Sequence, residues 1–232
     1  MTLAGQGAIA IWNDITNEAR QAYYDWHGRE HMPERVGIPG FLRGRRYVAI
    51  HGSPEYFTLY EVDSPQTLGG ADYANRLNHP TPWTAESIRH FRNVARALCR
   101  VAASFGSAQG GVVGTWRYDV PEAAAEEHRS ALARRILPEF ADQPGVAGVH
   151  LLIADMEASA TDTAEKRARG AADQLPRWIL LAEGWGDVET FEALCRKTLG
   201  DEVLAKAGAA GPAAFGLYRL QISRAKQPWT AS

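Results

Sequence analysis

The chain has 232 residues, of which 45% are hydrophobic and 22% charged, the proportions of an ordinary globular protein. This composition excludes a disordered chain, a collagen and a coiled coil, and the length allows one large domain or two small ones. The net charge of −2 at pH 7 creates no field that attracts a polyanion, so we expect no nucleic-acid partner.

The predicted elements of the first half follow the order strand, helix, strand, strand, helix, strand. Apolar and alternating runs predict strands at 7–14, 41–51, 55–62 and 93–104. The capping residues around Asp14 predict a helix that runs toward Pro33 and ends before Ile38. A second helix is predicted to begin near Ser64 and Pro65.

The second half repeats this order. Strands are predicted at 111–119, 146–154, 177–185 and 213–223, and helices at 121–138 and 187–207. The triplet Met32-Pro33-Glu34 recurs as Leu137-Pro138-Glu139 at an offset of 105 residues, and Pro39-Gly40 recurs as Pro144-Gly145 at the same offset. Two matches at one offset indicate a duplication.

Two βαββαβ units predict a tandem ferredoxin-like α+β fold, with the two sheets packed face to face as an α/β barrel. Residues 1–106 form the first repeat, 107–110 the linker and 111–225 a degenerate second repeat. An insertion at 157–174 is rich in Ala, Thr and charge without an apolar period, which predicts a solvated or partly disordered segment.

The richest candidate site lies on the first helix. His27 and His31 are four residues apart, so both imidazoles lie on one helix face. The 105-residue register aligns them with the apolar Leu132 and Ile136, which predicts that both positions face inward. They are therefore either hydrogen-bonded core histidines or members of a site, present in one repeat only.

A metal site is an alternative, because His-x-x-x-His is a familiar ligand spacing on helices. The central Glu of a zinc protease is absent, and spacing selects no third ligand among Glu30, Glu34 and Glu61. We therefore expect no metal.

Several short motifs resemble one protein family. They are Tyr23-Tyr24, His31-Met32-Pro33, Ile38-Pro39-Gly40-Phe41 and Arg45-Arg46-Tyr47-Val48. Together they resemble the EthD-like branch of the dimeric α/β-barrel superfamily, which is similar to antibiotic-biosynthesis monooxygenases and muconolactone isomerases. The resemblance implies small aromatic, polyketide or lactone substrates in a barrel cavity, no metal, and a helix histidine at His31. His27 has no assigned counterpart.

Charged strand residues are predicted to supply substrate contacts. Val94, Arg96, Leu98 and Arg100 are assigned to the barrel side of the strand 93–104, and Ala95, Ala97, Cys99 and Val101 to the helix side. Arg45, Arg100 and Glu61 are the candidate substrate-binding residues, against the alternative of a structural Arg–Glu network that includes Glu183.

The proline-rich segment 78–83 is predicted to be a loop over the cavity mouth. Trp83 would act as an apolar lid and His79 as a second proton-transfer group or substrate contact. The alternative is an anchored surface loop.

Three functions remain open. The first is a cofactor-independent isomerase, lyase or oxygenase in which His31 or His27 removes a proton and an arginine stabilises the oxyanion. The second is a haem protein with a helix histidine as ligand, as the resemblance also implies. The third is a small-molecule-binding barrel without activity.

The location and assembly follow from simpler features. The first residues lack a signal peptide, and no stretch approaches 18 uninterrupted apolar residues, so we expect a soluble, cytoplasmic protein without a membrane partner. Exposed sheet edges and helix faces favour a homodimer.

Overall fold

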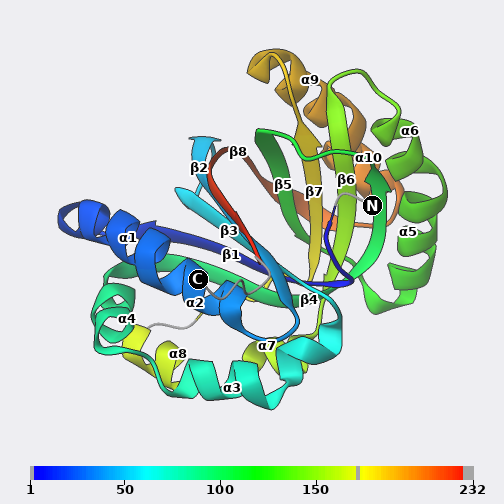
Figure 1. Cartoon of the computed structure of the whole chain (residues 1–232). Coiled ribbons are helices and arrows are strands. Elements are labelled where there is room, and N and C mark those ends of the chain that lie inside the picture. The colour runs from blue at the N-terminus through cyan, green and yellow to red at the C-terminus, as the bar shows by residue number, and fades with distance from the viewer. Residues whose placement is uncertain (1–2, 171–172, 227–232) are drawn as a thin grey trace.

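The computed structural model describes residues 3–170 and 173–226, and its centre is a closed barrel of eight antiparallel strands (Figure 1). Around the barrel the strands follow the order β1-β3-β2-β8-β5-β7-β6-β4. Their bounds are β1 Gly7–Ile15, β2 Phe41–His51, β3 Tyr56–Val62, β4 Phe91–Gly106, β5 Val112–Asp119, β6 Val146–Ala154, β7 Trp178–Gly184 and β8 Ala210–Ala225.

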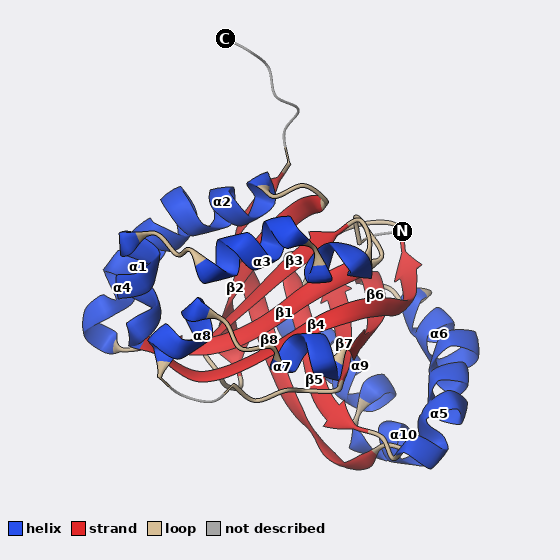
Figure 2. Ribbon diagram, turned by 90° about the horizontal axis from the view of Figure 1, so that it is seen from below, coloured by secondary structure: helices blue, strands red, loops and turns tan. Residues whose placement is uncertain are grey.

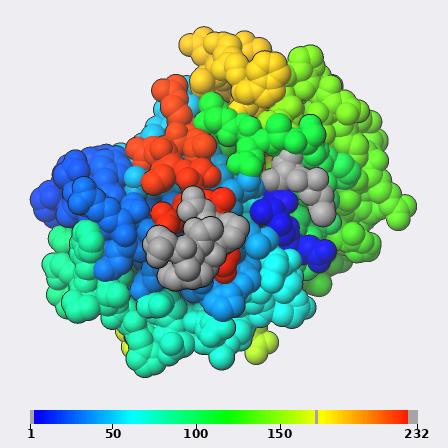
Figure 3. Space-filling view, viewed as in Figure 1, coloured from blue at the N-terminus to red at the C-terminus, as the bar shows by residue number. Residues whose placement is uncertain are grey.

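The barrel consists of two ferredoxin-like halves, as the duplication predicts. The order β4-β1-β3-β2 in the first repeat is matched by β8-β5-β7-β6 in the second. Two seams join the halves: β2 pairs with β8 and β4 pairs with β6. In the space-filling view the red end of β8 accordingly lies against blue and cyan first-repeat segments (Figure 3).

The helices lie outside the barrel, on the faces of the two sheets that point away from each other (Figure 2). Among the described residues, no helix is long and apolar enough to span a membrane. The helix bounds are α1 Arg20–Trp26, α2 Met32–Gly37, α3 Ala71–Asn78, α4 Pro82–Ser87, α5 Ala125–Ala131, α6 Leu137–Ala141, α7 Met156–Ala160, α8 Ala164–Arg169, α9 Val188–Leu199 and α10 Asp201–Lys206.

Each repeat carries a π-helical turn at the same place, His27–His31 in the first and Leu132–Ile136 in the second. The N–H of Met32 donates to the carbonyl of His27, and that of Leu137 to the carbonyl of Leu132. Each turn precedes a helical proline, whose ring would clash with a carbonyl of a regular α-helix. The wider π turn therefore lets the helix continue through the proline.

The barrel interior is packed with side chains from all eight strands. They include Trp12 stacked on Phe57 at 4.8 Å between ring centroids, together with Ala95, Ala97 and Cys99. The prediction for the faces of β4 is therefore wrong. Small β4 residues face the barrel because large aromatic side chains from the other strands fill it, and Arg96 and Leu98 lie under the first-repeat helices.

The insertion is also more ordered than predicted. Within 157–174 the described residues form the end of α7 and all of α8, and Ser159, Thr163 and Glu165 are buried. The hydroxyl of Ser159 accepts a hydrogen bond from Leu98 N at 2.9 Å, on a stretch of β4 that precedes its pairing with β6. The insertion thus covers a free strand edge. Ala171 and Ala172 lie outside the described residues.

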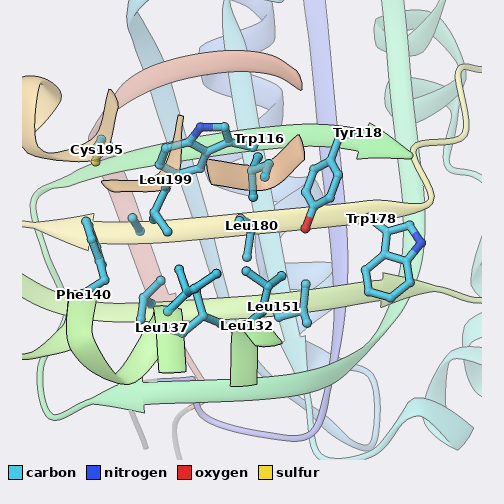
Figure 4. Packing of buried hydrophobic residues seen from close by; sticks show 14 of the residues in the cluster. Trp116, Tyr118, Leu132, Leu137, Phe140, Leu151, Trp178, Leu180, Cys195 and Leu199 are labelled. Carbon is cyan, nitrogen blue, oxygen red and sulfur yellow. The ribbon is translucent and has the colours of Figure 1, made fainter. Parts of the chain in front are cut away.

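The second repeat packs its helices on its sheet through one continuous cluster of buried apolar side chains (Figure 4). Leu132 and Leu137, from the π turn and α6, point at Leu151 and Leu180 on the sheet. Leu132 occupies the position of His27, so the second repeat fills with hydrocarbon the place where the first carries an imidazole.

The closed barrel changes the argument for a homodimer. Each of the eight described strands has two neighbours, which removes the argument for a homodimer from exposed sheet edges. The homodimer stays a prediction.

Candidate active site

His31 lies beside a small cavity between the first-repeat sheet and its helices. The cavity volume is about 40 Å³. Its walls come from β1, β3, β4, the α1–α2 helix, α3 and, unexpectedly, α8 of the second repeat. The prediction of a site inside the barrel is therefore wrong, because the barrel is packed and the histidine helix covers the outer face of the sheet. The polar lining residues are His31, Arg35, Tyr60, Tyr73, Arg96, Glu165 and Arg169.

Both candidate histidines are buried, as are Leu132 and Ile136 at the equivalent positions. The rings of His27 and His31 lie 5.6 Å apart between centroids, and that of His31 lies 4.3 Å from the ring of Trp26. Nδ1 of each histidine makes no hydrogen bond to any residue that the structure describes. Buried polar atoms without partners are unusual, and their presence favours a site over a satisfied core histidine.

The environment keeps His31 uncharged. Burial lowers its pKa well below 6.5, and the charges of Arg35 and Arg169, with the neighbouring imidazole of His27, lower it further. Burial also lowers the pKa of His27, with contributions from Arg46 and Arg35. A neutral imidazole can accept a proton at neutral pH.

Arg35, and not Arg45 or Arg100, is the arginine placed to stabilise an oxyanion beside His31. It is 2% exposed, lines the cavity with His31, and its Nη1 makes no hydrogen bond to the described residues. Arg35 was not among the predicted site residues, although the sequence carries a signal for it: His27, His31 and Arg35 recur every four residues and share a helix face.

Tyr60 is a second missed residue. Its hydroxyl is buried without a hydrogen-bond partner among the described residues, and it lines the same cavity. Burial raises the pKa of Tyr60 above its ordinary value, so its phenol stays protonated and can donate a hydrogen bond.

The structure places Arg45 and Glu61 on the other side of the sheet, inside the barrel. Arg45 is fully buried; its Nε lies 3.0 Å from Glu61 Oε1 and its Nη1 lies 2.7 Å from Glu183 Oε2. Glu61 also accepts a hydrogen bond from Arg43 Nη2 at 2.6 Å. The structure therefore shows the structural Arg–Glu network and does not join these residues to His31.

The other predicted contacts also lie apart from the cavity. Arg100 is exposed and lines a separate cleft beside Asp155, and His79 is exposed. Trp83 is 40% exposed and belongs to α4, because Thr81 caps a helix there and accepts a hydrogen bond from Thr84 N at 3.0 Å. The loop predicted at 78–83 is therefore in part a helix.

The donor set does not suit a metal. The structure engages each of the three suggested third ligands elsewhere: Glu30 accepts from Thr81, Glu34 from Arg76, and Glu61 lies in the barrel. Within residues 3–170 and 173–226, no group of three or more His, Cys, Asp or Glu side chains could hold a metal ion.

The closed cavity that the structure shows has no room for a haem. The cavity of about 40 Å³ is far smaller than the roughly 300–1,000 Å³ pockets that hold ligands of that size. Arg35 and Glu165 form a buried pair within it, so a porphyrin beside His31 would have to displace an ion pair.

A larger groove of about 630 Å³ lies over the second repeat, between the α5–α6 helix and α9–α10. Ile136, the counterpart of His31, is on its wall. The groove has no histidine among its lining residues, whose ionisable side chains are Glu127, Arg135, Glu139 and Lys206. The repeat that retains the imidazoles is thus the candidate active half.

Comparison with family models finds no match, and no curated protein matches the chain. Solved structures do match over nearly the whole length. An anthrone oxidase-like protein is 14% identical with a TM-score of 0.62, covering 97% of this chain and 95% of that one. A candidate monooxygenase from Fusobacterium nucleatum is 12% identical with a TM-score of 0.60, covering 97% and 96%.

A candidate chlorite dismutase is 11% identical with a TM-score of 0.56, covering 96% of each chain. At these identities the similarity concerns the fold. The EthD-like assignment stays an expectation, and the comparison shows that this chain has a ferredoxin-like barrel fold in common with these three solved structures.

Proposed function

We propose that the first repeat is an enzyme site that removes a proton from a small aromatic, polyketide-like or lactone compound without a bound cofactor. The observation that carries the proposal is the cavity lined by both His31 and Arg35, whose Nδ1 and Nη1 atoms have no hydrogen-bond partner among the described residues. An isomerase, a lyase or an oxygenase can all begin with this step.

The proposed step uses only side chains of the site. His31 accepts the proton of a C–H bond next to a carbonyl, and the electron pair moves to the carbonyl oxygen; with a phenol the pair stays on the phenolate oxygen. The guanidinium of Arg35 stabilises that oxyanion, and the protonated Tyr60 donates a second hydrogen bond. The imidazolium formed beside Arg35 is unfavourable alone, so proton transfer is coupled to the appearance of the oxyanion.

Oxygenase chemistry is the first outcome to examine. The name of the fold neighbour, an anthrone oxidase-like protein, suggests anthrones as compounds to examine. In that case the carbanion left by proton transfer to His31 would form a C–O bond with O₂ from solution, the imidazolium would return the proton to give a hydroperoxide, and loss of water would leave a new carbonyl group.

The test measures the rate at which the protein exchanges a substrate C–H with deuterium from the solvent. The wild-type protein should exchange the acidic C–H of anthrone-type ketones or lactones with deuterated solvent, measured by NMR, and His31→Ala should lower this rate at least 100-fold. His51 is exposed and pairs with Glu192, so His51→Ala is the matched control and should keep the wild-type rate. Exchange that survives in His31→Ala, or that no compound of the panel shows, contradicts the proposal.

A further inference from the structure

A helix of the second repeat closes the candidate site of the first. Glu165 on α8 forms a buried ion pair with Arg35, and both side chains are less than a tenth exposed. In Figure 1 the yellow-green α8 lies beside α3 and α4 of the first repeat, and Figure 2 shows the same arrangement from below. The segment has no counterpart between the equivalent strands of the first repeat.

The cavity carries an excess of positive charge. Arg35, Arg96 and Arg169 all line it; Arg35 pairs with Glu165 and Arg169 pairs with the buried Asp173 at 2.7 Å, so Arg96 is the surplus cation. Arg96 Nη2 donates to Tyr73 Oη at 2.8 Å. Nη1 of Arg35 and Nε of Arg169 are buried without a partner among the described residues. Donors of this kind suit an anion, which they bind by charge-assisted hydrogen bonds.

The insertion is held firmly at its ends and loosely in its middle. Its ends bond to the β4 backbone, with Asp155 N donating to Leu98 O and Gln174 N to Val94 O, each at 2.8 Å. Among the described residues, two polar contacts join α8 to the first repeat: the Arg35–Glu165 pair and a bond from Ala164 N to Asn78 Oδ1 at 3.1 Å. Movement of α8 would break this ion pair and the packing of Ala168 on the cluster that contains Trp26 and Ile88, and it would leave the strand-edge bonds intact.

The cavity must enlarge before it can hold an aromatic ring. Its volume of about 40 Å³ compares with the roughly 150 Å³ that a benzene-sized ligand occupies in a protein core. The wall formed by α8 belongs to an insertion that is bonded to the β4 backbone near its two ends, so this wall can move without disrupting the sheet.

We propose that Glu165 is a built-in occupant of a carboxylate subsite on Arg35, and that α8 is a lid which opens when an anionic group of the substrate takes the place of Glu165. The substrate class is then an aromatic compound with a carboxylate. The inference rests on the proposed function only in treating this cavity as the substrate site. A ligand without negative charge cannot replace Glu165, because it would leave Arg35 buried and unpaired.

The test uses benzoate as the probe and uncharged benzamide as its isostere, with affinities measured by calorimetry on the full chain. Glu165→Gln should bind benzoate at least 10-fold more tightly than wild type, since the competing carboxylate is gone. Its affinity for benzamide should equal that of wild type. The matched control Asp162→Asn removes the exposed pair with Arg167 in the same insertion and should behave as wild type. Equal benzoate affinity in Glu165→Gln and wild type would overturn the subsite. An equal rise in affinity for benzamide would also overturn it, because it would show that the substitution only opens the cavity and that the ligand charge plays no part.

Two further measurements keep the result interpretable. The double variant Arg35→Gln/Glu165→Gln leaves no buried charge of the pair unpaired, and it should lose the gain for benzoate while keeping a wild-type near-ultraviolet spectrum. Benzoate at saturation should speed tryptic cleavage after Arg167 several-fold in wild type, since Arg167 is on α8. An unchanged cleavage rate would overturn the lid.

The two proposals can fail separately. In the His31→Ala background, the effect of Glu165→Gln on benzoate affinity should persist although proton exchange is lost. Lost exchange with an intact benzoate effect supports both proposals. Exchange that survives in His31→Ala contradicts the function alone, and a missing benzoate effect contradicts the subsite alone.

Discussion

Arg45 of the first repeat and Glu183 of the second form a two-pronged ion pair across the barrel, with Nη1–Oε2 at 2.7 Å and Nη2–Oε1 at 2.9 Å. Both side chains are buried, and Arg45 also contacts Glu61. His150 Nε2 lies 3.4 Å from the same carboxylate. The network joins strands β2, β3, β6 and β7, so it ties the repeats together inside the barrel.

Arg45→Ala should strongly destabilise the protein. Removal of the guanidinium leaves two buried carboxylates without their shared partner, which costs about 3–5 kcal/mol of unfolding free energy. Urea unfolding followed by circular dichroism measures this. Arg129→Gln, which removes an exposed pair with Glu126, is the control and should leave the midpoint unchanged. A small effect of Arg45→Ala would mean that water reaches the network.

Acid should weaken the same network. Burial alone would raise the pKa of Glu183, but the hydrogen bond from His150 and the Arg45 guanidinium hold it at about 2. The carboxylate thus contributes stability above its ordinary pKa of 4.5, and this contribution is lost as the pH falls from about 4.5 toward 2. Chemical unfolding at pH 7, 4 and 3 should show a steeper loss for wild type than for Glu183→Gln. Parallel curves would contradict the assignment.

Copying the second repeat into the first should stabilise the protein and abolish its activity. In His27→Leu/His31→Ile, two buried imidazoles with unpartnered Nδ1 atoms are replaced by the residues that occupy the equivalent positions at Leu132 and Ile136. Since an unsatisfied buried polar group costs about 1–3 kcal/mol, the unfolding free energy should rise by about that amount or more. Denaturant unfolding measures the gain; a loss would show that the histidines are needed for packing.

Activity should persist below the pH at which an ordinary histidine protonates. Because burial and Arg35 lower the pKa of His31 well below 6.5, the imidazole stays neutral as the pH falls through 6.5, and kcat/KM should decline only at lower pH. NMR titration, with the His31 signal assigned by its absence in His31→Ile, should give the same low value. A rate profile with its midpoint at 6.5 or above would contradict a buried base.

The order of strands along the chain and the duplication could be predicted from local patterns. Eight apolar runs and two matches at a 105-residue offset sufficed, because the period of hydrophobicity and the proline positions are properties of short segments. The same offset also relates the two π turns. The folding of α8 could not be predicted in this way, since it depends on a partner 130 residues away: Arg35.

The orientation of β4 depended on tertiary packing. Ala95, Ala97 and Cys99 suited either face, because both faces of this sheet are covered and a strand buried on both sides has no polar face to mark its orientation. The bulk of Trp12 and Phe57 inside the barrel selected the small residues for the interior.

The candidate site divides in the same manner. His27, His31 and Arg35 share a helix face by spacing, so the chain order alone specifies that they lie together. Which side of the sheet they face, which charges surround them and what closes the cavity depend on the meeting of distant segments. The burial and the pKa of a side chain depend on contacts between segments that are distant in the sequence. These contacts exist only in the folded chain, so the sequence pattern alone could not specify them.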